Sequence, residues 1–81
     1  MHFAAPDPKN YQRLQSLPAE EAIACYLGGK FTIGEDSALL EAIQRGLSLP
    51  MKHEKIEDIL LACAEEEVTV EECRSRLVSG A

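Results

Sequence analysis

The sequence predicts an all-α fold of five short helices, arranged as two helix-loop-helix repeats behind an N-terminal helix. Three observations support this prediction. Leu, Ala, Ile and Glu dominate the chain and aromatic residues make up only 5% of it, a balance that favours helices over sheets. Apolar residues recur at helical spacing in several segments. The pentapeptide at residues 31–35 (FTIGE) returns at residues 68–72 (VTVEE), which indicates that one unit is used twice.

The 81 residues are enough for one domain with a single modest core. Residues 1–6 are predicted to form an extended arm, because Pro6 and Pro8 exclude a helix there. Asp7 suits the N-cap, and Pro8 the first position, of an N-terminal helix over residues 7–16. A single helical domain therefore begins at Asp7.

The rest of this domain, which ends at residue 78, divides into two units at residues 17–46 and 48–78, and a tail at 79–81 is expected to fray. In the first unit, Gly28 and Gly29 supply a left-handed stop for a helix. The first helix of the second unit is about one turn longer. Its apolar residues are spaced for one buried face: Ile56, Ile59, Leu60 and Cys63.

Thr32 and Thr69 are the expected N-caps of the second helix in each unit. Each precedes a glutamate by three positions, which is the spacing of a capping box in which both side chains satisfy free backbone N–H groups. We therefore expect the Thr32 and Thr69 side-chain oxygens to accept hydrogen bonds from the N–H groups of Glu35 and Glu72.

The segments at residues 31–35 and 68–72, which we call the two joints because each links the two helices of a unit, also resemble the second half of an EF-hand loop. Phe31 and Val68 match the apolar residue that lies in a short strand pairing two such loops, and the glutamates at 35 and 72 match the closing glutamate. The resemblance implies a minimal two-stranded pairing of residues 31–33 with 68–70. The oxygen-donor positions hold other residues: Ala24, Tyr26 and Gly28 in the first loop, and Leu61, Cys63 and Glu65 in the second. We therefore expect a degenerate pair that binds no calcium.

The charge and the cysteines restrict the class of protein. With 14 acidic and 8 basic residues the formal net charge is −6, which disfavours direct binding to nucleic acid. No apolar run is long enough to cross a membrane. Three cysteines without a Cys-x-x-Cys motif, together with the absence of a charged-then-apolar leader, favour a reducing, cytoplasmic location.

No set of residues predicts a reaction, so we expect no enzyme, no catalytic residue and no cofactor. Cys25, Cys63 and Cys73 fall on apolar helical faces, where cysteine acts as a small hydrophobic residue. Together with His2 and His53 they match no zinc-binding spacing, and no metal site is predicted.

The candidate binding site is acidic. Eight of the 14 carboxylates lie between Glu54 and Glu72, and they form either a solvated helix face or a docking face for a basic partner. The docking residues would be Glu54, Glu57, Asp58, Glu65, Glu66, Glu67 and Glu71. An alternative site is an apolar groove between the two units, lined by Leu39 and Ile43.

The expected function is that of a small, acidic, cytoplasmic protein-interaction module that binds another protein with a basic surface. Two alternatives stay open. The chain could be an inhibitor of phage or mobile-element type that blocks a nucleic-acid-binding surface by charge mimicry, or a minor non-catalytic subunit of an enzyme complex. The sequence also leaves open a homodimer and a docking role for the N-terminal arm.

Overall fold

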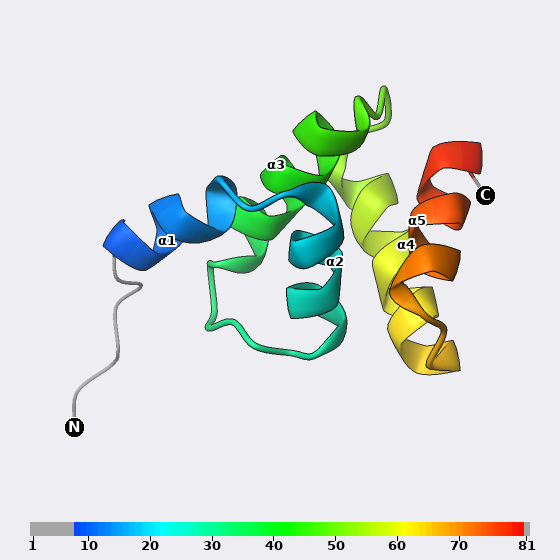
Figure 1. Ribbon diagram of the computed structural model, residues 1–81, viewed down its shortest axis with the longest axis horizontal. Coiled ribbons are helices and arrows are strands. Elements are labelled where there is room, and N and C mark those ends of the chain that lie inside the picture. Colours follow the sequence, from blue (N-terminus) through cyan, green and yellow to red (C-terminus); the bar gives the residue numbers. More distant parts are fainter. Residues whose placement is uncertain (1–7, 81) are drawn as a thin grey trace.

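Five helices follow one another in the computed structural model, which describes residues 8–80 (Figure 1). They are α1 (Pro8–Gln15), α2 (Ala19–Leu27), α3 (Asp36–Leu47), α4 (His53–Glu66) and α5 (Val70–Ser79). The described residues contain no strand, so the predicted all-α class with five helices is confirmed. The predicted arm over residues 1–6, the Asp7 cap and Ala81 of the tail lie outside the described residues.

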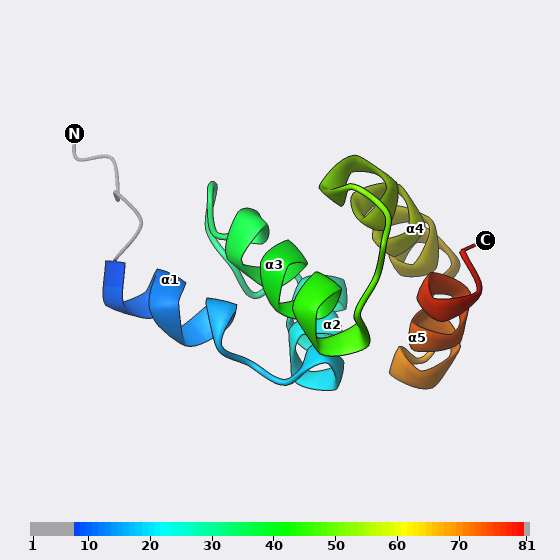
Figure 2. The same cartoon turned by 90° about the horizontal axis from the view of Figure 1, so that it is seen from above.

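The helix α2 lies at the centre of the arrangement. It packs against α3, α4 and α5, whereas α1 packs mainly on α3 at one end of the body (Figures 1 and 2). The longest dimension is 42 Å, and α4 and α5 lie at the end opposite α1. None of the described helices has both the length and the apolarity needed to cross a bilayer.

The core is formed by the apolar residues that recur at helical spacing. Each helix contributes at least one fully buried side chain, among them Leu14, Ile23, Leu39, Ile43, Ile56, Leu60 and Leu77. The predicted inward face of α4 is confirmed, since Ile56, Leu60 and Cys63 are fully buried and Ile59 is 6% exposed. Removing such side chains from water is the main stabilising contribution in a domain of this size.

The helices α2 and α3 approach closely at Gly46. A Cβ atom built on Gly46 would lie 2.7 Å from the Cβ of Ala19, the first residue of α2. Glycine at this position therefore lets the two helices touch. The sequence suggested that the helix would end near Gly46, but α3 continues to Leu47 and is closed by Ser48 in the left-handed region, with a φ of 52°.

The second of the two predicted N-caps is confirmed. Thr69 precedes α5 with an extended backbone, and its Oγ1 accepts a hydrogen bond from the N–H of Glu72 at 3.1 Å. The Glu72 side chain does not return to Thr69, because it accepts a hydrogen bond from Arg76 at 3.1 Å instead.

The prediction for Thr32 is wrong. The N-cap of α3 is Glu35, whose N–H bonds to the carbonyl oxygen of Thr32 at 3.0 Å, and whose carboxylate accepts the N–H of Thr32 at 2.9 Å. The difference between the two joints is Gly34, which stands where the second joint has Glu71 and takes a φ of 94°. Because such a φ is cheap only for glycine, an extra turn forms here before the helix begins.

The predicted pairing of residues 31–33 with 68–70 is also wrong, because both segments are already engaged elsewhere. The N–H groups of Lys30 and Val68 bond to carbonyl oxygens of their own preceding helices, at 3.1 Å in both cases. Phe31 stacks on Tyr26 with ring centroids 5.1 Å apart, and Val70 is the first residue of α5. Neither segment is a strand, and no ladder joins them in the described residues.

Candidate functional site

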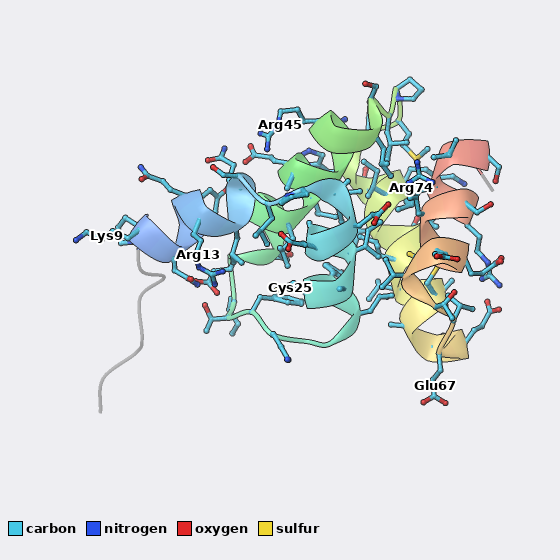
Figure 3. All side chains as sticks on the ribbon, in the orientation of Figure 1. Lys9, Arg13, Cys25, Arg45, Glu67 and Arg74 are labelled. Carbon is cyan, nitrogen blue, oxygen red and sulfur yellow. The ribbon has the colours of Figure 1, made fainter. Side chains whose placement is uncertain are left out.

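The negative charge is concentrated in one half of the molecule. Residues 8–52 contain five basic and five acidic residues, whereas residues 53–80 contain three basic and eight acidic residues. We call residues 53–80, which comprise α4, α5 and the turn between them, the acidic half. Lys9 and Arg13 lie at the α1 end of the molecule and Glu67 at the opposite end (Figure 3).

The outer face of α4 carries an acidic row with one apolar residue in it. We call this row, Glu54, Asp58, Leu61 and Glu65, the acidic crest. The four residues are spaced at i, i+4, i+7 and i+11, which places them along one side of a helix. All four are exposed, and the exposed fraction of Leu61 is 52%. The crest therefore combines negative charge with an apolar side chain left in solvent.

None of the crest carboxylates has a cationic partner within the described chain. The ion pairs among residues 8–80 join Arg74 to Glu20 at 3.8 Å, and Arg76 to Glu66 and Glu72 at 3.0 and 3.1 Å. Glu67 and Glu71 are likewise exposed and without such a partner. These five carboxylates produce an uncompensated negative potential over α4 and the start of α5.

Two of the predicted docking residues have partners inside the molecule. Glu57 is half-buried, and its Oε2 lies 3.5 Å from the hydroxyl of Tyr26, which can donate to it. Burial, with the negative charge of Glu57 beside it, raises the pKa of Tyr26 to about 12. Glu66 accepts a hydrogen bond from Arg76, and this bond holds the pKa of the Glu66 carboxyl below its usual range. Of the seven predicted residues, Glu54, Asp58, Glu65, Glu67 and Glu71 are therefore free to meet a partner.

The turn between α4 and α5 presents its charge outward. Glu67 closes α4 in the left-handed region, with a φ of 54°, and is exposed at the end of the molecule (Figure 3). A left-handed backbone is uncommon for a residue other than glycine, asparagine or aspartate. This conformation lets Glu67 lie between Glu65 at the end of α4 and Glu71 at the start of α5.

A groove of about 420 Å³ lies beside the crest, between α4 and α5. We call it the α4–α5 groove. Its lining is formed by Lys55, Asp58, Ile59, Ala62 and Arg76. A second groove, of about 370 Å³, lies between α2, α3 and α5 and is crossed by the Arg74–Glu20 pair. The first groove is continuous with the crest, because Asp58 belongs to both.

The alternative site proposed from the sequence does not lie at the surface. Leu39 and Ile43 are both 0% exposed and belong to the main core cluster. Helical spacing groups Leu39 and Ile43 on one apolar face, but spacing alone does not distinguish a core from an open groove. The sequence also missed the apolar part of the acidic half. Leu61 was detectable as an apolar residue on an otherwise acidic helix face.

In residues 8–80, no group of three or more His, Cys, Asp or Glu side chains could hold a metal ion. Burial raises the pKa of Cys73 to about 12, with Cys63 beside it, so this thiol resists ionisation. The glutamates compared with an EF-hand are engaged elsewhere, Glu35 by Thr32 and Glu72 by Arg76.

Comparisons with known proteins add no relative. No protein-family model matches the chain, and neither a curated protein nor a solved structure matches it. None of these comparisons identifies the resemblance to EF-hands. The function must therefore be inferred from the surface of α4 and α5.

Proposed function

We propose that this chain is a cytoplasmic protein-interaction module that docks on a basic protein surface through the acidic crest and the α4–α5 turn. One observation carries the proposal: the crest carboxylates of Glu54, Asp58 and Glu65 have no cationic partner in the described chain, and they surround an exposed leucine. Concentrated charge of one sign accelerates encounter with a surface of the opposite sign.

Leu61 supports a protein surface as the partner. An exposed apolar residue is ordinary by itself, and Ile33 and Val78 are also exposed, but Leu61 stands among unpaired carboxylates, and interfaces between proteins combine a polar rim with apolar side chains that lose their water on contact. On the crest, Leu61 lies one turn from Asp58 and one turn from Glu65, so a partner that pairs with the carboxylates would also cover the leucine.

Charge mimicry is the second candidate function. In this case the basic surface that the chain occupies is the nucleic-acid-binding site of its partner. The crest carboxylates form a row along about 16 Å of helix axis, a length over which a nucleic-acid strand carries about five phosphates. A partner whose nucleic-acid site is basic could therefore accept α4 in place of its usual ligand. A minor subunit of an enzyme complex would use the same face.

The proposal is tested with two variants of equal net charge. The crest variant is Glu54→Gln, Asp58→Asn and Glu65→Gln, and the control is Glu20→Gln, Glu21→Gln and Glu41→Gln in the charge-balanced residues 8–52. Each immobilised protein is exposed to extract of the organism that encodes it at about 0.05 M and about 0.5 M salt. Retained proteins are identified by mass spectrometry, and association rates are then measured with the purified partner.

We expect wild type and the control to retain the same basic protein at low salt and to lose much of it at high salt. The crest variant should associate about tenfold more slowly at low salt, with a smaller change in dissociation. Equal association rates for wild type and the crest variant at low salt would refute the proposal. Release of the captured protein by duplex DNA would support charge mimicry, and retention in the presence of DNA would exclude it.

A further inference from the structure

The α4–α5 groove has an apolar floor beside the charged crest. Ile59, only 6% exposed, and Ala62, which is exposed, lie one turn apart on α4, and Arg76 of α5 lines the opposite side. The volume of about 420 Å³ is sufficient for one large apolar side chain. Neighbouring helices α4 and α5 are joined by a tight turn, which holds the two sides of the groove at a fixed separation (Figure 1).

Arg76 contributes to this groove without adding free positive charge. Its Nη2 donates to Glu66 at 3.0 Å and its Nε to Glu72 at 3.1 Å, so one guanidinium joins the last turn of α4 to the first turn of α5. The side chain is 29% exposed. These two bonds hold the guanidinium in place and neutralise it, which leaves the aliphatic part of Arg76 to line the groove.

The free charge beside the groove is negative. Asp58 lies on the rim, and Glu54 and Glu65 lie one and two turns away on the same crest, all without cationic partners. Lys55 is the single opposing charge on the rim. A partner that fits must therefore bring an apolar side chain to Ile59 and Ala62 and basic side chains to the carboxylates.

The geometry points to a definite occupant: one large apolar side chain of a partner segment, flanked by lysines or arginines that pair with Asp58, Glu54 and Glu65. This inference rests on the proposed function and specifies the chemistry of the partner at the same surface. The charged residues would set the rate and orientation of docking, while the apolar side chain would slow dissociation. A second copy of this chain fits less well, because the same acidic half would face itself.

Two synthetic peptides test the inference. Each has about 15 residues, because shorter helices are hardly stable in water. Both carry lysines at i and i+4 spacing, and they differ only in one central residue, leucine in the first and alanine in the second. Binding to the full chain is measured by fluorescence anisotropy at about 0.05 M and about 0.15 M salt. We expect the leucine peptide to bind about tenfold more tightly, as burial of one leucine side chain allows.

Two variants of the chain show where the leucine of the peptide binds. Ala62→Gln fills the groove with an uncharged side chain that is well tolerated in helices, and Ala24→Gln makes the same change on an exposed position of α2. The preference for the leucine peptide should disappear in Ala62→Gln and persist in Ala24→Gln. The crest variant should weaken both peptides equally, because it removes charge, keeps the size of the Asp58 side chain on the rim and leaves the apolar floor of Ile59 and Ala62 unchanged.

Three results would overturn the groove as an anchor. They are equal binding of the two peptides to wild type, a preference for leucine that survives in Ala62→Gln, and a dimer in sedimentation that Ala62→Gln dissociates. If both peptides bind equally and salt weakens both, the groove fails while docking by the crest stands. If neither binds at low salt, the groove fails and the capture experiment decides the proposed function.

Discussion

At the scale of single residues, Glu35 is the buried charged side chain of the described chain, with an exposed fraction of 3%. Its carboxylate accepts the Thr32 N–H at 2.9 Å and the Asn10 side-chain amide at 2.7 Å. These two hydrogen bonds, the backbone bond first, hold the pKa of Glu35 below its ordinary value of 4.5. Glu35 therefore joins α1 to the start of α3 in its ionised form.

Replacement of Glu35 by glutamine should destabilise the fold in a pH-dependent way. Because the folded-state pKa is lowered, the stabilising contribution is fully present above the unfolded value of about 4.5 and is lost as pH falls through the folded value. The free energies of unfolding of wild type and Glu35→Gln should therefore differ most at neutral pH and converge in acid. Urea denaturation at a series of pH values measures this.

The control for this experiment is Glu65→Gln, since Glu65 is exposed and accepts no hydrogen bond within residues 8–80. This variant should track wild type at every pH. A gap between wild type and Glu35→Gln that stays constant from neutral pH into acid would show that ionisation of Glu35 contributes nothing.

At the scale of helices, the two joints differ although their sequences are alike. Thr69 caps α5 through its side chain, whereas α3 is capped at Glu35 and Thr32 takes part mainly through its backbone. A side chain that satisfies a free N–H at a helix start contributes more than one that stands before an extra turn.

Thr69→Ala should lower the free energy of unfolding by about 1 kcal/mol, the usual cost of losing an N-cap side chain. Thr32→Ala should cost clearly less, because its N–H and carbonyl bonds survive the substitution. Chemical denaturation of both variants at neutral pH gives the comparison. Equal losses would mean that the Thr32 hydroxyl also caps a helix.

Gly46 sets how closely α2 and α3 pack. Gly46→Ala would normally stabilise a helix by up to about 1 kcal/mol, but here the new Cβ would lie 2.7 Å from that of Ala19. Overpacking of this kind costs about 1–3 kcal/mol, so we expect a net loss of about 1 kcal/mol in urea denaturation. In a double-mutant cycle, Ala19→Gly should cost less in the Gly46→Ala background than in wild type. A Gly46→Ala protein more stable than wild type would contradict the close packing.

At the scale of the whole molecule, the sequence predicted the helices well because the spacing of their apolar residues matches the period of a helix. Ile56, Leu60 and Cys63 could be buried together only on a helix, and they are. Thr32 was mispredicted because its pentapeptide matches that of Thr69 at the capping positions and differs at Gly34, where the backbone conformation decides the result. A local pattern does not show which of two turns a glycine will form.

The candidate surface was predicted in part. Charge density along the chain indicated the acidic half. Which of its carboxylates have a partner inside the molecule depends on contacts between distant residues. Glu57 meets Tyr26 and Glu66 meets Arg76, at separations of 31 and 10 residues. The groove depends on the packing of α4 against α5, which no spacing within one helix can reveal.

The separation of charge along the 42 Å body gives the molecule an electric dipole moment. Its centre of negative charge is displaced from its centre of mass toward α4 and α5, because residues 8–52 are balanced in charge. A positive surface within a Debye length, about 8 Å at physiological ionic strength, therefore exerts a torque as well as an attraction. The torque turns the acidic end to the front before contact, so fewer encounters begin in the wrong orientation.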